Sequence, residues 1–465
     1  MSTQDLAGRA GQSETAKGLH AALGRLLSLV QGEDDRGRAQ RGALLAFSIR
    51  VASAAIAYLS QVLLARWMGS FEYGIFVFVW VWVLILGGLA PLGLSTATIR
   101  FVAEYKERGR LPLLRGLLLG SRLISVGVST VLMLAGLGAL ALFGELVQHY
   151  YLLPAILILF CLPAYTIEDV QDGIARGKGW IDIALVPPYI LRPLLILLGM
   201  IAAIALGFPM TAVTAAGAAI VACWVAGLVQ VFVLERRLRQ TVPAGRRCYR
   251  TGLWLKTSLP MLLLHGFELV MQNTDVLVLS LYMTPSDVAV YFAALKTMGL
   301  ITFVHFAVAA AAANRFSAYN ARGDKAELSA FVREAVRWTF WPSLAAAIGL
   351  LALGWPLLWL FGPEFTAGYP AMFVLAVGFL VRAAVGPAEH VLAMLGEQSR
   401  CAAVLFAAAG LNIALNFLLI PHYGLMGAAA ATSASIAAAA VLMLMVAKRR
   451  LGLDILVWRR GEAGR

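Results

Sequence analysis

Residues 257–283 read TSLPMLLLHGFELVMQNTDVLVLSLYM, an apolar run that carries polar side chains at regular intervals. A helix needs about 20 apolar residues to cross the hydrocarbon core of a bilayer, and this run is long enough. His265, Glu268, Gln272 and Asp275 are separated by three, four and three positions, so they share one face of a helix. The run therefore predicts a membrane-spanning helix with a polar stripe along one side.

The composition of the whole chain agrees with a membrane protein. Of its 465 residues, 60% are apolar and 14% charged, against about 45–50% and 25% in soluble domains. A chain with so few polar residues cannot be a soluble enzyme, because a soluble surface needs more of them. The same composition excludes a disordered protein and a disulfide-rich secreted domain. The four cysteines lack the spacing of a metal site and are interpreted as small buried residues, so we predict no metal and no cofactor.

Scanning for apolar runs predicts an all-α polytopic membrane protein with twelve spans in two groups of six. The first group comprises 42–66, 73–96, 116–143, 149–167, 181–207 and 211–235. The second comprises 254–283, 286–314, 337–361, 368–390, 398–420 and 424–447. The run 181–207 is the least regular, because Pro187, Pro188 and Pro193 interrupt it.

The positions of the basic residues predict the orientation. Most of the 38 Lys and Arg residues fall in the tails and in alternate loops, and cytoplasmic loops collect these residues. We therefore expect both termini in the cytoplasm and interpret the net charge of +13 as an orientation signal rather than a nucleic-acid-binding surface. The expected organisation is a tail 1–41, with a possible interfacial helix over 14–31, a lobe 42–235, a loop 236–253, a lobe 254–447 and a basic tail 448–465.

The two predicted lobes share a polar motif. In each lobe it follows the second span: Arg100-Phe101, Tyr105 and Arg108-Gly109 recur as Arg315-Phe316, Tyr319 and Arg322-Gly323. Because six spans return the chain to the same side, such repeats would have parallel orientation, with a site between them near the middle of the bilayer. This arrangement is typical of alternating-access transporters.

Ionisable residues inside spans cost about 2.5–3.5 kcal/mol each on insertion scales, so they should face a cavity or a partner. The substrate-binding candidates are Arg50, Gln61, Arg192, Lys296 and Arg382. Glu268 and Asp275 are candidates for ion coupling, or else structural counter-ions. Other interpretations remain open: Arg122 can snorkel to headgroups, Arg382 can pair with Glu389, and Asn412 and Asn416 can join helices.

The balance of these charges indicates which kind of molecule would be transported, which we call the passenger. Cations outnumber anions among the residues that the scan places within spans. Such an excess suits an anionic passenger, such as a pyrophosphate or carboxylate headgroup, better than a cationic drug.

Four stretches also resemble a known family: ARWMGSFEYGIF (65–76), GLSTATIRFVAEY (93–105), TDVLVLSLYMTPSDVAVYFAALK (274–296) and LNIALNFLLIPHYGLMGAAAATSAS (411–435). They are similar to the O-antigen and exopolysaccharide repeat-unit flippases of the MOP superfamily, whose fold is MATE-like. The resemblance covers residues 42–447. It implies two six-helix lobes around a cavity whose cations, here Arg50, Arg192 and Lys296, hold an oligosaccharide on polyprenyl pyrophosphate. The related peptidoglycan-precursor flippases differ in typically having fourteen spans.

We therefore expect a bacterial inner-membrane flippase for lipid-linked oligosaccharides, with H⁺ or Na⁺ coupling and with polysaccharide polymerases and glycosyltransferases as possible partners. The alternative is a cation-coupled exporter of drugs or metabolites from the same superfamily. An enzyme is disfavoured, because the predicted external loops are short and the sequence has no G-x-x-x-x-G-K-[ST] motif.

Overall fold

The computed structural model describes residues 35–322, 325–453 and 455–457. The predicted interfacial helix over 14–31 lies outside these residues. The chain separates after Val51 into two compact units, the second of which begins at Ala52. In the first unit, the described residues form the start of a helix. All contacts discussed below belong to the second unit.

Helices and turns make up the described residues, without a β-strand among them. The first group comprises α2 (Asp35–Leu89), α3 (Leu94–Glu107), α4 (Leu111–Phe143), η1 (Gly144–Leu146), α5 (His149–Leu159), α6 (Leu162–Gly177), α7 (Ile181–Val186), η2 (Pro187–Leu191), α8 (Arg192–Ala205) and α9 (Ala212–Thr241). The second comprises α10 (Thr251–Tyr282), α11 (Pro285–Gly299), α12 (Thr302–Arg322), α13 (Lys325–Ala352), α14 (Gly354–Phe361), η3 (Pro363–Gly368), α15 (Tyr369–Val385), α16 (Ala388–Met394), α17 (Gln398–Val446) and η4 (Ala447–Leu451). The predicted all-α class is confirmed for this part of the chain.

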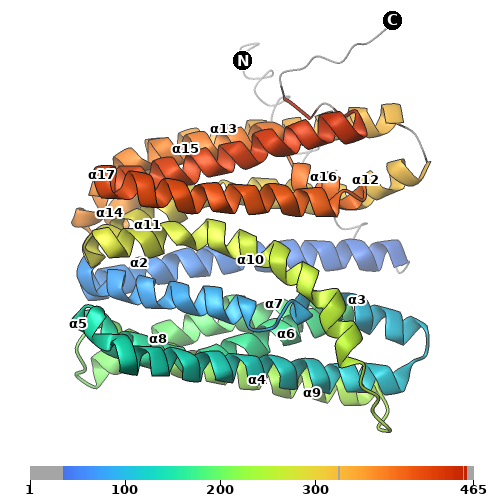
Figure 1. The fold of residues 1–465 in the computed structure, drawn as a ribbon, viewed down its shortest axis with the longest axis horizontal. Helices are drawn as coiled ribbons and strands as arrows, with labels where there is room; N and C mark the ends of the chain where they lie inside the picture. Colours follow the sequence, from blue (N-terminus) through green and yellow to red (C-terminus); the bar gives the residue numbers. More distant parts are fainter. Residues whose placement is uncertain (1–34, 323–324, 454, 458–465) are drawn as a thin grey trace, which may run out of the picture. The chain divides into compact units, whose positions relative to one another are not determined.

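Nine helical stretches of the described residues are long and apolar enough to cross a membrane, or ten if α5 and α6, bent by 47°, form one span. Two of these stretches greatly exceed the length that a bilayer requires, and a non-helical glycine divides each. Gly69 interrupts α2 and Gly424 interrupts α17, both with positive φ that glycine adopts without strain. Figure 1 shows the chain turning back within each of these helices.

The proline-rich span forms as the sequence predicts, with an irregular middle. Helix α7 ends at Val186, a π-helical turn covers Pro187–Leu191, and α8 begins at Arg192. Proline has no N–H to donate to the preceding turn, so the wider π turn carries the chain past Pro187 and Pro188. The wider turn brings Arg192 to the first position of α8.

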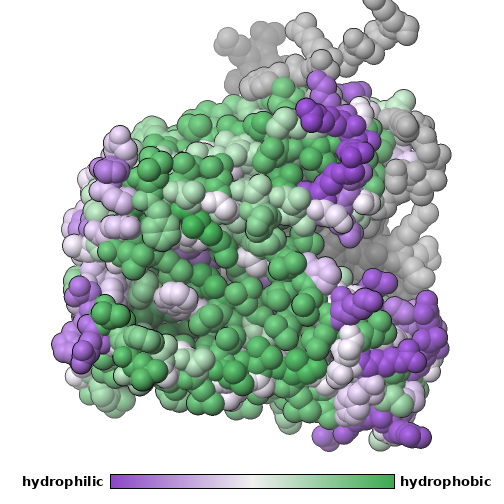
Figure 2. All heavy atoms as spheres, in the orientation of Figure 1, coloured by the Kyte–Doolittle hydropathy of each residue, from purple (hydrophilic) through white to green (hydrophobic). Residues whose placement is uncertain are grey.

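The surface has the polarity of a membrane protein. Figure 2 shows a broad hydrophobic band bounded by hydrophilic residues at two opposite edges of the face in view. Large apolar side chains such as Leu142, Phe232 and Val377 are exposed. Contact between such surfaces and lipid has no hydrophobic cost, whereas contact with water would have one.

Two helix groups pack mainly within themselves. In the first, α3, α4, α6, α8 and α9 contact one another, and in the second, α12, α13, α15 and α17 do so. Figure 1 shows these groups on opposite sides of α10. We call the first group, together with the part of α2 that follows Gly69, the N-lobe, and the second group, together with α11, α14 and η3, the C-lobe.

Helix α10 contacts both lobes. At its start, the Trp254 indole N–H donates to the Tyr105 hydroxyl of α3 at 3.0 Å, and further along α10 packs closely against α17. The polar stripe that the sequence indicates therefore lies on the helix that joins the lobes.

Candidate functional site: a polar cleft beside α10

The polar stripe of α10 is accessible, although it faces other helices. The side chains of His265 and Glu268 are 47% and 51% exposed, and Gln272 is exposed as well. Glu268 accepts a hydrogen bond from the Gln272 amide at 3.2 Å and lies 4.0 Å from His265 Nδ1. A Cβ added at Gly88 of α2 would lie 3.8 Å from His265 Nε2. The stripe therefore borders an accessible space beside α2, which we call the hollow, and its polar groups can remain hydrated there.

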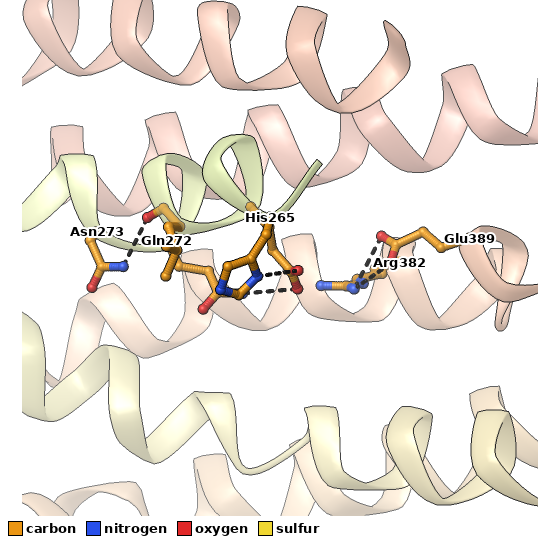
Figure 3. Close-up of polar contacts among 7 residues, drawn as sticks. His265, Gln272, Asn273, Arg382 and Glu389 are labelled. Carbon is orange, nitrogen blue, oxygen red and sulfur yellow. Dashed lines mark hydrogen bonds and ion pairs between the residues drawn. The ribbon is translucent and has the colours of Figure 1, made fainter. Parts of the chain in front are cut away.

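An arginine–glutamate pair lies across this hollow. Arg382 Nη2 of α15 contacts both carboxylate oxygens of Glu389 of α16, at 3.1 and 3.3 Å. The chain breaks between the two helices at Gly386, which has φ +64°, and this break returns Glu389 to Arg382. Figure 3 shows the guanidinium group of Arg382 directed toward His265 of α10 and contacted by Glu389. The pairing that the sequence left open for Arg382 is observed.

Two histidines extend this cluster into the C-lobe. The rings of His305 and His390 lie 6.2 Å apart, centroid to centroid. Neither ring nitrogen of His305 has a hydrogen-bond partner among the described residues. These two histidines could not be recognised from the sequence, because they lie in different predicted spans and share no spacing.

Lys296 is an exposed cation next to buried neighbours. It occupies the last turn of α11, where Leu295 and Thr297 are buried, and its Nζ lies 4.8 Å from the centre of the Phe292 ring. Within the described residues, no carboxylate lies within 4.0 Å of this amine. Of the candidate cations in the second unit, Lys296 is thus the one without a carboxylate in direct contact, and the nearest charge that acts on it is that of the buried Asp275.

Arg192, by contrast, is neutralised inside the N-lobe. Its Nη1 lies 2.8 Å from Oε2 of Glu168, and both side chains are nearly inaccessible. The guanidinium also lies over the rings of Tyr165 and Trp80, with 4.6 and 5.8 Å to the ring centres. Glu168 was missed because the predicted span ends at 167, whereas α6 continues to Gly177. Because Glu168 balances Arg192, the excess of cations over anions within the helices is smaller in the structure than the sequence indicates.

Asp275 is buried away from the hollow. One of its carboxylate oxygens accepts hydrogen bonds from the hydroxyls of Tyr291 (2.5 Å) and Thr432 (3.1 Å), and the other accepts one from the backbone N–H of Val276. These bonds join α10, α11 and α17. Asp275 is therefore separate from the exposed face of the stripe, although its spacing in sequence continues that face.

The remaining candidates lie elsewhere. Gln61 accepts a hydrogen bond from Tyr73 at 2.5 Å, and Tyr73 packs against Phe292 and Phe365 of the C-lobe. Arg50 belongs to the first unit. The structure thus brings together His265, Glu268, Gln272, Arg382 and Glu389, and places Arg192, Asp275 and Gln61 in three separate networks.

Comparison with known proteins identifies the family. The sequence model of a family described as polysaccharide biosynthesis protein matches residues 39–317. This chain belongs to the polysaccharide biosynthesis protein family. It is also 22% identical over 406 residues to an uncharacterized membrane protein, MJ1068, of Methanocaldococcus jannaschii, which covers 81% of this chain and 77% of that relative.

Solved structures show which known proteins share the fold. A multidrug resistance MATE family transporter in an inward-facing conformation matches with a TM-score of 0.73 and 17% identity, covering 87% of this chain and 98% of that one. The lipid II flippase MurJ in an inward closed conformation matches with a TM-score of 0.68 and 14% identity, covering 87% of each chain. The family resemblance inferred from the sequence is confirmed, and the fold is shared with a MATE family transporter and with a lipid II flippase.

Proposed function

We propose that this protein flips oligosaccharides linked to polyprenyl pyrophosphate from the inner to the outer leaflet of the bacterial cytoplasmic membrane. The products would serve the synthesis of a surface polysaccharide such as O-antigen, exopolysaccharide or capsule, alongside polymerases and glycosyltransferases. In this proposal the chain has twelve spans with both termini in the cytoplasm. The observation that carries it is the exposed polar stripe of α10, together with Lys296 of α11 as an exposed cation that has no ion-pair partner within the described residues.

The physical reason for such a hollow is the cost of moving sugars through lipid. Each unpaired hydroxyl that leaves water costs several kcal/mol, so an oligosaccharide needs a polar route while its prenyl tail stays in the bilayer. The exposed groups of His265, Glu268 and Gln272 supply such a route. Alternating access of the two lobes then carries the headgroup across, and no bond is made or broken.

Within the second unit, the proposed headgroup contacts are Lys296 and Arg382, with Gln61 and Arg192 in supporting positions. Arg50, in the first unit, is a candidate from its place in the sequence. Lys296 contributes most, because Arg382 and Arg192 are each already paired with a glutamate. An interior-negative membrane potential favours outward movement of an anion by about 2.3 kcal/mol per charge per 100 mV. Ion return through Glu268 or Asp275 can add to that drive.

Transport by reconstituted protein tests this proposal. Proteoliposomes would contain a polyprenyl-pyrophosphate-linked oligosaccharide in the starting leaflet, and its arrival in the other leaflet would be measured by its accessibility to an added glycosidase. Replacing Lys296 by alanine removes a charged contact worth about 1.5–3 kcal/mol, so uptake should weaken roughly 10- to 100-fold. Lys256→Ala, at another exposed lysine near the start of α10, is the matched control. Equal transport by Lys296→Ala and wild type would refute the headgroup site.

The exporter of cationic drugs or metabolites remains a second candidate because of one observation. Glu168 and Glu389 neutralise Arg192 and Arg382, and Glu268 is half exposed in the hollow. A less cationic hollow is more tolerant of a cationic passenger. Increased drug sensitivity of a deletion strain that retains normal surface polysaccharide would favour this candidate.

A further inference from the structure

The connection from α9 to α10, residues 242–250, lies against the first turns of α4, and we call it the strap. The backbone N–H of Cys248 donates a hydrogen bond to the carbonyl oxygen of Pro112 at 2.9 Å. A Cβ at Gly116 of α4 would overlap the carbonyl oxygen of Cys248, so the two backbones meet where only glycine leaves room. The strap is therefore held against the N-lobe, although it contains neither helix nor strand.

Arg115 of α4 fixes the strap at two further points. Its Nε donates a hydrogen bond to the carbonyl oxygen of Pro243 at 2.7 Å, and its Nη1 donates one to the carbonyl oxygen of Arg246 at 3.3 Å. The backbone at Gly245 lies against the same guanidinium group, since a Cβ there would be 2.6 Å from Nη1. Bonds at Pro243, Arg246 and Cys248 thus fix the backbone that carries the exposed side chains of the strap.

The strap carries three exposed arginines without acidic neighbours. They are Arg246, Arg247 and Arg250, and within the described residues no carboxylate lies within 4.0 Å of any of them. The sequence from 236 to 267 contains neither aspartate nor glutamate. Helix α10 begins directly after Arg250, and the N-terminal end of a helix adds partial positive charge. The strap therefore presents a cationic surface whose charge is not neutralised by this part of the chain.

Apolar side chains continue from these cations along α4 and α10. Tyr249 and Leu253 are 51% and 44% exposed, and a Cβ at Gly120 would lie 3.5 Å from the Tyr249 ring, which places this ring beside α4. Further along the two helices, Leu123 and Leu263 are exposed as well. The connection between α9 and α10 lies at the edge of the bundle (Figure 1), where hydrophilic residues border the hydrophobic band (Figure 2). Tyrosine is common at such a boundary between lipid and water.

We propose that the strap binds an anionic phospholipid. The lipid phosphate lies at Arg246, Arg247 and Arg250, and the acyl chains lie along the exposed apolar side chains of α4 and α10. An acidic protein segment would match the cations, but it would leave the adjoining apolar surface uncovered. In the orientation of the proposed function this lipid belongs to the cytoplasmic leaflet, whose anionic lipids attract basic segments. The inference goes beyond that function, because it concerns a lipid bound beside the helices and not the transported molecule.

Native mass spectrometry of the full-length protein in detergent tests this binding without any transport. The protein would be mixed with phosphatidylglycerol or with phosphatidylcholine of identical acyl chains, and the fraction that carries bound lipid would be measured. Attraction by the three arginines should make phosphatidylglycerol bind roughly 10- to 100-fold more tightly. Equal binding of the two lipids would overturn the proposal. Displacement of phosphatidylglycerol by inorganic phosphate or by poly-glutamate at equal concentration would also overturn it, and would identify a site for a free anion or for an acidic protein.

The triple variant Arg246→Gln/Arg247→Gln/Arg250→Gln should lose most of the preference for phosphatidylglycerol. Because the three side chains are exposed, this variant is expected to fold. The matched control removes the same charge from three exposed cations of η4, as Lys448→Gln/Arg449→Gln/Arg450→Gln. It should keep the preference. Equal losses in the two triple variants would indicate unspecific attraction by basic residues and would overturn the proposal.

Gly116→Ala separates the geometry of the strap from its charge. The added methyl group would displace the Cys248 carbonyl, while every arginine remains. We expect the preference for phosphatidylglycerol to fall several-fold in this variant. Gly127→Ala of the same helix is the control, since a Cβ there meets nothing within 4 Å, and it should keep the preference. An unchanged preference in Gly116→Ala would show that the fixed path of the strap is not required, and it would overturn the proposal of a built lipid site.

Discussion

Gly74 of α2 lies directly against the backbone of Pro285 at the start of α11, so closely that a Cβ at Gly74 would overlap the Pro285 carbonyl oxygen. This contact joins the N-lobe to the C-lobe. Ser70 and Ser286 lie beside it with their hydroxyl oxygens 3.3 Å apart, and Tyr73 packs on Phe292 and Phe365. The two lobes are therefore closed against each other at the end of the bundle that contains the Gly69 turn, while the hollow beside α10 is accessible.

Gly74→Ala should open this contact. The added methyl group cannot be accommodated by rotating a side chain, because the atom that it meets belongs to the Pro285 backbone. In a background without the four native cysteines, we expect oxidative cross-linking of a Ser70→Cys/Ser286→Cys pair to fall several-fold. Little change is expected for a Thr211→Cys/Thr214→Cys pair inside the N-lobe, where the hydroxyl oxygens lie 3.4 Å apart. Gly217→Ala is the control, since a Cβ there meets nothing within 4 Å. Unchanged inter-lobe cross-linking in Gly74→Ala would show that the contact is not required for this conformation.

Glu168→Gln should destabilise the protein strongly. It leaves the buried Arg192 without its counter-ion, and breaking a buried pair in this way costs about 3–5 kcal/mol. The double variant Arg192→Met/Glu168→Gln should recover much of the loss, because the unpaired charge is gone. Thermal unfolding in detergent would measure both.

The exposed pair of Arg237 and Asp182, 3.1 Å apart, provides the comparison for this prediction. Asp182→Asn should cost no more than about 1 kcal/mol, because solvent screens exposed pairs. If Glu168→Gln were as stable as Asp182→Asn, Arg192 would not depend on Glu168. It would then be available for the headgroup role that its position in the sequence first suggested.

Much of the fold can be predicted from the sequence because lipid imposes a simple rule on composition. Apolar runs of sufficient length locate the helices, and the prolines correctly mark 181–207 as irregular. The breaks at Gly386 and between α11 and α12 are not predictable in this way, since hydropathy stays high across them. They depend on local backbone geometry and on packing against neighbouring helices.

The candidate site could be predicted only in part. The spacing of His265, Glu268 and Gln272 places them on one face, and the structure keeps them together. The Arg192–Glu168 pair could not be found, because its members are separated by 24 positions and the acidic run after 167 ends the hydropathic signal. Asp275 shows a further limit: helical spacing gives the face of α10, whereas the neighbours α11 and α17 decide whether that face is buried.

Asp275→Asn should abolish any stimulation of transport by an ion gradient while preserving the fold. The amide has nearly the same size as the carboxylate, and it can still accept a hydrogen bond from a neighbouring hydroxyl or from the Val276 N–H. It cannot bind a proton or attract a cation through a negative charge. Transport with and without an imposed H⁺ or Na⁺ gradient would be compared in proteoliposomes. The exposed Glu145, replaced by glutamine, is the control.

Tyr291→Phe separates the charge of Asp275 from its structural contacts. This variant removes a 2.5 Å hydrogen bond to a carboxylate, which should cost about 1.5–3 kcal/mol and lower the unfolding temperature. The carboxylate itself remains, so stimulation by the gradient should persist. The expected pattern is therefore a stable but uncoupled Asp275→Asn and a less stable but coupled Tyr291→Phe. If Asp275→Asn retained the response to both gradients, Asp275 would be a structural residue that joins α10, α11 and α17, and coupling would have to lie elsewhere.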